Sequence, residues 1–420
     1  MITGERVLWT SNEGTKFFKK TGETGVSLSR FGRASIESVR KFHSTIPGYK
    51  PTPLRNLDGM AKTLNLGAIY VKDESFRFGL NAFKSLGCSY AVAKLLASRM
   101  GLESEDISYE TISGAEAGKA LGSVTFAAVT DGNHGRGVAW IARMLGHKAE
   151  IFMPKGSSES RISAIRAEGA SVTVRGMNYD ESVEMTAREA GERGWTVIQD
   201  TAWEGYTDIP FWTMQGYCTM ALEASEEIIR LTGGDLPTHV FVQAGVGSMA
   251  ASVQGFFRAC FPQNPPKIVV VEASKADCFY KSAVGGQGAP RVVSGDLDTI
   301  MAGLACGSPN FAAWEILRDY ASLFASCPDY VTAHGMRALG CPERGDHRVI
   351  SGESGAVTMG LLSLIMRDSR LSAMRITLGL NDKSRVLLFS TEGDTDPEKY
   401  RSITWDGEFP TYDLSVYSKP

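Results

Sequence analysis

The sequence of 420 residues contains no long apolar segment and carries little net charge. No apolar run approaches the roughly 18 residues that a membrane-spanning helix needs. The formal net charge of -3 at pH 7 gives no electrostatic attraction to nucleic acid or to an anionic membrane. The first residues are polar and charged, without the apolar core of a secretory signal. We therefore expect no nucleic-acid partner and no membrane partner.

Cysteine and histidine are also too few and too scattered for a disulfide framework or a metal site. The seven cysteines are an odd number, and no two of them form a Cys-x-x-Cys pair. The six histidines do not form a His-Glu-x-x-His pattern. These absences predict a cytoplasmic protein that holds no metal ion.

Short apolar segments alternate with longer helical patterns over most of the chain. Such alternation is typical of an α/β protein with a mostly parallel sheet. A chain of 420 residues is too long for one small core, which favours two domains. The patterns predict strands at residues 126–129, 149–153, 171–174, 195–199, 239–243, 267–272 and 385–389, and helices at residues 57–64, 85–100, 136–145, 158–168 and 181–192.

Three segments lack a clear period. Residues 1–49 are aromatic, basic and irregular, and we expect them to wrap the outside of a domain. Residues 102–122 are acidic and rich in glycine and alanine, which predicts an insertion or a mobile excursion. Residues 284–288 are glycine-rich and predict a loop.

A lysine stands where a predicted strand gives way to a predicted helix. Lys84 follows the apolar residues 69–71 and precedes the segment 85–100, which is rich in alanine, leucine and lysine. An amine at such a junction is suited to bonding a carbonyl carbon, either of a substrate or of pyridoxal phosphate. The alternative is a solvated lysine in the first turn of a helix.

A glycine-containing loop follows another predicted strand. Residues 243–250 read Gln-Ala-Gly-Val-Gly-Ser-Met-Ala and lead into a helix. Backbone N–H groups at a helix N-terminus bind phosphate without a cationic side chain. A dinucleotide site is disfavoured. The third glycine is missing, and although Ala250 is the allowed small variant, no strand carrying a ribose-binding acid follows at the usual spacing. Close packing of helix on strand is the alternative.

Two further loops begin where predicted strands end. Residues 130–135 read Thr-Asp-Gly-Asn-His-Gly, and residues 389–394 read Phe-Ser-Thr-Glu-Gly-Asp. Ligands bind at the carboxyl ends of strands in open α/β sheets. The alternatives are a structural loop capped by Asp131 and a cluster of helix-capping hydroxyls.

Along the chain the four stretches follow one another as the lysine, the asparagine loop 130–135, the glycine loop 243–250 and the hydroxyls of 389–394. In that order they resemble the fold type II pyridoxal-phosphate enzymes, the family of tryptophan synthase β, threonine dehydratase and cysteine synthase. The resemblance covers most of the chain and implies pyridoxal 5'-phosphate as the cofactor, an amino acid as the substrate and a homodimer. It also implies two open, mostly parallel α/β domains with the cofactor in the cleft between them. The large domain would comprise residues 1–88 and 200–420, and the smaller inserted domain residues 89–199.

The resemblance also assigns roles to individual residues. Lys84 would carry the cofactor and later take the Cα proton, for which burial would have to depress its pKa. Asn133 would lie beside the phenolic oxygen of the cofactor. Ser390 or Thr391 would face the pyridine nitrogen, and the register favours Ser390. The phosphate would be held by Gly245, Val246, Gly247, Ser248 and Met249.

Within this family, residues 76–84, 131–140, 199–206 and 390–396 look like those of the diaminopropionate ammonia-lyases. A dehydratase usually has serine or alanine where Asp131 stands, and a run of glycines where this chain has Gly-Val-Gly-Ser-Met. The resemblance implies that Asp131 takes the Cα proton of the D-isomer, and that Asp200 holds the ammonium groups of the substrate.

The resulting expectation is a carbon–nitrogen lyase. It would convert D- and L-2,3-diaminopropionate by α,β-elimination to pyruvate and two ammonia. The alternatives are a serine or threonine dehydratase, or a β-replacing synthase, of the same fold. A more distant alternative is a non-catalytic anion or nucleotide binder.

Overall fold

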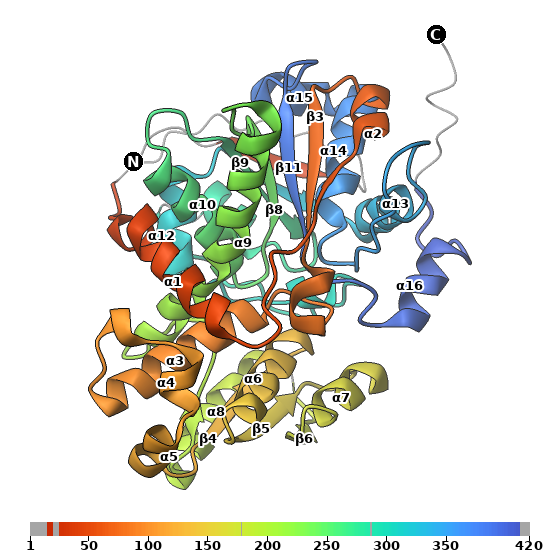
Figure 1. Ribbon diagram of the computed structural model, residues 1–420. Helices are drawn as coiled ribbons and strands as arrows, with labels where there is room; N and C mark the ends of the chain where they lie inside the picture. The colour runs from red at the N-terminus through yellow and green to blue at the C-terminus, as the bar shows by residue number, and fades with distance from the viewer. Residues whose placement is uncertain (1–14, 20–24, 178, 286–287, 412–420) are drawn as a thin grey trace.

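The computed structural model describes residues 15–19, 25–177, 179–285 and 288–411, and two β-sheets organise them (Figure 1). The larger sheet has the strand order β1-β10-β9-β8-β11-β3-β2, and the smaller has the order β6-β5-β4-β7. This mixed α/β architecture confirms the predicted fold class. Within the described part of the chain, no helix combines the length and the apolar character that crossing a membrane requires.

The larger sheet is parallel except at its two edges, where β1 and β2 run antiparallel to their neighbours. Its inner strands are nearly continuous apolar runs because both faces are covered by helices. The strands are β1 (Lys16–Lys19), β2 (Leu54–Asn56), β3 (Ala68–Asp73), β8 (His239–Gln243), β9 (Lys267–Ala273), β10 (Leu323–Cys327) and β11 (Arg385–Ser390).

Successive residues of β9 show how this sheet divides the core. Ile268 and Val270 belong to one hydrophobic cluster, whereas Val269 and Val271 belong to the other. The first face is covered by α1 (Arg33–Thr45), α9 (Asp208–Thr232), α10 (Ser248–Cys260) and α12 (Phe311–Tyr320) (Figure 1). The second face is covered by α2 (Asp58–Thr63), α13 (Asp329–Gly340), α14 (Val357–Arg367) and α15 (Ser372–Leu378). Two further helices are α11 (Cys278–Gly285) and α16 (Pro397–Thr404).

The smaller sheet is entirely parallel and lies beside one end of the larger one (Figure 1). Its strands all fall between Thr125 and Val197 of the sequence. They are β4 (Thr125–Val129), β5 (Lys148–Met153), β6 (Ser171–Val174) and β7 (Thr196–Val197), with helices α6 (Asn133–Met144), α7 (Glu159–Arg166) and α8 (Tyr179–Arg193).

Helix α3 (Ser85–Met100) lies between α9 and α6, and glycines allow its close approach to both. A Cβ at Gly87 would lie 2.4 Å from the ring of Tyr217, and a Cβ at Gly216 would lie 2.5 Å from the carbonyl oxygen of Leu86. A Cβ at Gly137 of α6 would lie 2.9 Å from Cys88 Sγ. The start of α3 is therefore fixed against helices of both sheets.

Most predicted elements are confirmed. The helix at residues 85–100 and the strands at 171–174 and 239–243 have the observed bounds. The predicted helix at 136–145 begins earlier, at Asn133, and the strand at 195–199 is shorter, at Thr196–Val197. The glycine-rich segment 284–288 is not wholly a loop, because α11 continues to Gly285; residues 286–287 lie outside the described part.

The expectation of irregular structure is wrong for part of residues 1–49, of which residues 1–14 and 20–24 lie outside the described part. Residues 33–45 form the helix α1, whose spaced apolar side chains were hidden among charged ones, and residues 16–19 form an edge strand. Residues 102–122 contain α4 (Tyr109–Ser113) and α5 (Ala115–Leu121). The first begins with a capping box, in which Ser108 and Thr111 satisfy each other's backbone N–H groups.

The close approach of α3 and α9 predicts the effect of a single methyl group. We expect Gly87→Ala to lower the free energy of unfolding by about 1 to 3 kcal/mol, because the buried Tyr217 ring cannot move without shifting a helix. Gly118→Ala in α5 is the matched control, since no atom lies within 4 Å of its Cβ. Urea denaturation measures both, and equal stability of the two variants would contradict the prediction.

Candidate active site

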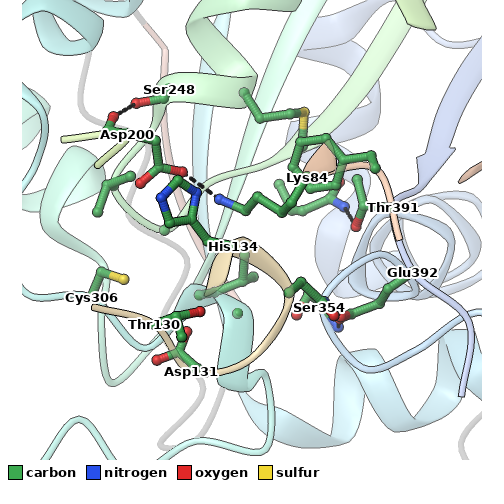
Figure 2. Close-up of a pocket in the computed structure, with 18 of the residues that line it drawn as sticks. Lys84, Thr130, Asp131, His134, Asp200, Ser248, Cys306, Ser354, Thr391 and Glu392 are labelled. Atoms are coloured by element: carbon green, nitrogen blue, oxygen red, sulfur yellow. Dashed lines mark hydrogen bonds and ion pairs between the residues drawn. The ribbon is translucent and has the colours of Figure 1, made fainter. Parts of the chain in front are cut away.

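A cavity of about 800 Å³, counted with its opening to solvent, lies where strands of both sheets end. The lining comes from the segments after β4, β8 and β11, together with Lys84, Asp200 and Arg161 (Figure 2). The four stretches that the sequence singled out therefore meet at one place.

Lys84 is the residue that immediately precedes α3, and its side chain lines the cavity. Its segment is held by backbone pairing, because the N–H of Phe83 donates to the carbonyl oxygen of Thr391 at 3.0 Å. Lys84 Nζ lies 2.5 Å from Asp200 Oδ2 (Figure 2). The lysine is thus not a solvated residue of a helical turn, and its charge is paired inside the cavity.

Asp200 is held in place by partners on several elements. The hydroxyl of Tyr217 donates to Asp200 Oδ2 at 3.2 Å. The Asp200 backbone carbonyl accepts from Ser248 Oγ at 2.5 Å and from Asn310 Nδ2 at 3.1 Å. Burial acts to raise the pKa of Asp200, but Lys84 and other partners outweigh it and lower the pKa to about 2. Asp200 is consequently an anion at neutral pH.

The pKa of Lys84 is raised above its ordinary value in this arrangement of side chains. Burial is the largest influence and lowers the pKa, as we expected, but the Asp200 carboxylate and its hydrogen bond raise it more. The depressed pKa was expected for the lysine beside the bound cofactor, and it stays a prediction. Lys84 is held as a cation for as long as Asp200 is its partner.

The loop between β8 and α10 has the form of a phosphate cradle. Gly247 has a φ of 89°, and a Cβ on it would lie 2.1 Å from the ring of Phe279. A Cβ on Gly245 would lie 2.9 Å from the carbonyl oxygen of Gly303. The first N–H groups of α10 have no acceptor within the helix and lie beside the cavity. These features fit the phosphate of pyridoxal phosphate, and they place residues 245–249 on the cavity wall.

Of the two hydroxyls at the carboxyl end of β11, that of Thr391 lines the cavity and that of Ser390, the last residue of the strand, does not. Thr391 Oγ1 accepts a hydrogen bond from Gln243 Nε2 at 2.7 Å (Figure 2). Ser390 Oγ donates to the carbonyl oxygen of Glu392 at 3.4 Å and is fully buried. Alignment with the family favoured Ser390, but in this structure the Ser390 side chain lies behind the cavity wall.

Residues of the loop after β4 line the side opposite the phosphate cradle. Asp131 is partly buried, and burial raises its pKa to about 6, although Arg161 and Lys84 oppose this rise. Asn133 Nδ2 donates to Glu392 Oε2. His134 Nε2 donates to the carbonyl oxygen of Ile198 at 2.8 Å, and burial lowers its pKa, so this ring is neutral and packed.

Sequence reasoning missed Arg161, which lines the cavity, and its partner Glu353, which lies behind the lining residues. Arg161 of α7 forms an ion pair with Glu353, which lies before α14. Burial raises the pKa of Glu353 to about 7, and the nearby Glu392 adds to this rise. Neither Arg161 nor Glu353 lies in a recognisable motif, whereas Glu392 stood inside the stretch 389–394 without a role. In the described residues, no group of three or more histidine, cysteine or acidic side chains could hold a metal ion.

The geometry agrees with the comparisons with known proteins. Residues 45–382 match the family model of the pyridoxal-phosphate dependent enzymes. The chain therefore belongs to this class of enzymes.

More similar relatives narrow the family. The chain is 50% identical over 394 residues to diaminopropionate ammonia-lyase of Escherichia coli K12, covering 94% of this chain and 96% of that one. It is 48% identical over 390 residues to the enzyme of Salmonella typhimurium, covering 93% and 96%. The chain belongs to the diaminopropionate ammonia-lyase family.

Solved structures agree with this placement. The holo form of the Escherichia coli enzyme superposes with a TM-score of 0.87 at 48% identity, covering 94% of this chain and 98% of that one. The same enzyme in complex with D-serine gives a TM-score of 0.87 at 47% identity, with the same coverage. Maize serine racemase, at 19% identity and a TM-score of 0.64, covering 88% of this chain and 96% of that one, shares the fold.

Proposed function

We propose that this protein is a pyridoxal-phosphate-dependent carbon–nitrogen lyase that acts on both isomers of 2,3-diaminopropionate. The α,β-elimination would release pyruvate and two ammonia, with one water consumed. The observation that carries the proposal is a cavity lined by one lysine and two aspartates, in a chain that is 50% identical to diaminopropionate ammonia-lyase over 94% of its length.

The cofactor would be held by groups that already line the cavity. Lys84 would bond it covalently, residues 245–249 would bind its phosphate, and Asn133 would donate to its phenolic oxygen. We assign the hydroxyl at the pyridine nitrogen to Thr391 rather than to Ser390, because Thr391 lines the cavity. Bound pyridoxal phosphate withdraws electrons from the substrate Cα and so allows its proton to leave.

Three charged side chains of the cavity would have separate roles in the reaction. Lys84 would take the Cα proton of the L-isomer, and Asp131 would take that of the D-isomer. A pKa of about 6 leaves Asp131 mostly ionised at neutral pH and able to accept a proton. Asp200, with a pKa of about 2, would bind the second ammonium group of the substrate. That binding competes with Lys84 for the same carboxylate, which would release Lys84 from its counter-ion.

We also propose the division into a large domain, residues 1–88 and 200–420, and a smaller inserted domain, residues 89–199. In support, the described strands of the smaller sheet all lie in the inserted segment. The Arg161–Glu353 ion pair joins the two segments at the cavity. Movement of the smaller domain over the substrate would shield the reaction from water. The homodimer and the cytoplasmic location are expectations from the resemblance and from the cysteine content.

The substrate assignment predicts a clear order of rates. We expect kcat/KM for pyruvate formation from diaminopropionate to exceed that from serine or threonine by at least about 10- to 100-fold, because only the diamine makes a charge-assisted contact with Asp200. Lys84→Ala should lose both the activity and the visible absorption of the bound cofactor. Lys94→Ala, on the same helix but paired with Ser104, should keep both.

Coupled detection of pyruvate measures these rates, and a spectrum of the purified protein measures the bound cofactor. Faster turnover of serine or threonine would favour the dehydratase alternative. Protein that binds no pyridoxal phosphate, or that keeps the absorption band after Lys84→Ala, would favour the non-catalytic anion binder.

The role of Asp131 predicts a difference between the isomers. Asp131→Asn should lower kcat on D-diaminopropionate by about 100- to 10,000-fold, since it removes a general base, and should lower kcat on the L-isomer less than about tenfold. Asp106→Asn, an exposed aspartate of the segment before α4, is the matched control. Steady-state rates on the separate isomers measure this difference. An equal loss of kcat on both isomers would refute the role of Asp131 as the base for the D-isomer.

A further inference from the structure

Glu392 is a buried carboxylate of the cavity to which neither the sequence motifs nor the proposed reaction gives a role. Its side chain is 3% exposed and lines the cavity beside Ser354 (Figure 2). Asn133 Nδ2 donates to Glu392 Oε2, and the N–H of Ser354 donates to Glu392 Oε1 at 3.4 Å. Asn133 begins α6 of the smaller sheet, whereas Glu392 follows β11 of the larger sheet. The Asn133–Glu392 hydrogen bond therefore joins the two halves of the site.

The backbone of Glu392 is tied to the segment that carries Lys84. Glu392 forms an isolated antiparallel bridge with Ala82. The N–H of Gly393 donates to the carbonyl oxygen of Asn81 at 3.0 Å. The carbonyl oxygen of Glu392 accepts from the N–H of Gly352 at 2.9 Å. The position of Glu392 is thus set by the same pairing that sets the position of Lys84.

Close packing also fixes the Glu392 side chain. A Cβ on Gly352 would lie 2.7 Å from Glu392 Cγ, so the side chain fills the space above this glycine. Arg161 supplies the opposite charge nearby. Burial lowers the pKa of Arg161, but Glu353, Glu392 and Asp131 together outweigh burial and raise it. The carboxylate is therefore a rigid, charge-compensated acceptor.

A rigid carboxylate next to an amide determines which way the amide points. Asn133 has two N–H donors on Nδ2 and an acceptor at Oδ1. If the amide turned by half a rotation, Oδ1 would face the Glu392 carboxylate, and two acceptors would repel each other. Glu392 thus selects the orientation in which Nδ2 lies on its side, and it uses one of the two N–H groups.

We propose that Glu392 is the positioning residue for Asn133, directing the second N–H of the Asn133 amide toward the phenolic oxygen of the cofactor. This inference rests on the proposed function, because it requires pyridoxal phosphate in the cavity. Without Glu392, the amide would be free to rotate, and the donor to the phenolic oxygen would be lost for part of the time.

A double-mutant cycle on cofactor binding tests the inference. We expect Glu392→Ala and Asn133→Ala each to weaken the binding of pyridoxal phosphate by about tenfold, the effect of one lost hydrogen bond. The double variant should also bind about tenfold more weakly, rather than about a hundredfold, because both changes remove the same contact. Glu392→Gln keeps an acceptor oxygen and should weaken binding by less than about threefold.

The measurement is a titration of cofactor-free protein with pyridoxal phosphate, followed by visible absorption. The absorption maximum of the bound cofactor should shift in the same direction in Glu392→Ala and Asn133→Ala. Glu398→Ala, which removes an exposed carboxylate of α16, should match the native protein in both affinity and spectrum. If Glu392→Ala does not fold by circular dichroism, Glu392→Leu, which fills more of the same space but cannot accept a hydrogen bond, replaces it in the cycle, and the same non-additivity is expected.

The titration distinguishes a failure of the proposed function from a failure of the role proposed for Glu392. If the native protein and Glu398→Ala bind no pyridoxal phosphate, the proposed function fails. If both bind it but the double variant shows the product of the single effects, or Glu392→Ala matches the native protein, then Glu392 does not act through Asn133.

Discussion

The pairing of Lys84 with Asp200 is the interaction on which the rest of the site depends. Two opposite charges are removed from water at 2.5 Å, and such a pair is stable only if its remaining atoms are also satisfied. Tyr217 supplies a donor to the carboxylate, and the first turn of α10 holds its backbone through Ser248. Asp200 therefore connects Lys84 and helix α9 through its carboxylate, and the phosphate cradle through its backbone carbonyl.

The surrounding scaffold holds this pair by close packing and by buried charge. Glycines 87 and 216 bring α3 and α9 together, so that Tyr217 reaches Asp200. Beneath the segment that leads to Lys84, Glu223 of α9 accepts from Lys72 at 2.5 Å and from Arg77 at 2.8 Å. Removal of one partner from such a buried cluster is costly, typically about 3 to 5 kcal/mol. The cluster thus anchors the lysine segment to α9 from the other side.

Local sequence was sufficient to predict the helix after Lys84, and it singled out the stretches around Lys84, Asp131 and Gly245 that line the cavity, because each depends on residues that are neighbours in the chain. It was insufficient for Arg161 and Glu353, which are brought together only by the folded arrangement of the sheets. The choice between Ser390 and Thr391 stays a prediction, although only Thr391 of the two lines the cavity. Successive side chains at the end of a strand point in opposite directions, so a register uncertain by one residue exchanges the two faces. The pKa of Lys84 depended on Asp200, a partner more than a hundred residues away.

The central claim is that Asp200 holds Lys84 as a cation until another cation displaces it. The rate at which cofactor-free protein takes up pyridoxal phosphate tests this directly, since only a neutral lysine attacks the aldehyde. Between about pH 6 and pH 10, the rate for the native protein should rise about tenfold per pH unit. For Asp200→Asn, burial should lower the pKa of Lys84 unopposed, so the rate should level off at a lower pH. Identical pH profiles for the two proteins would contradict the account.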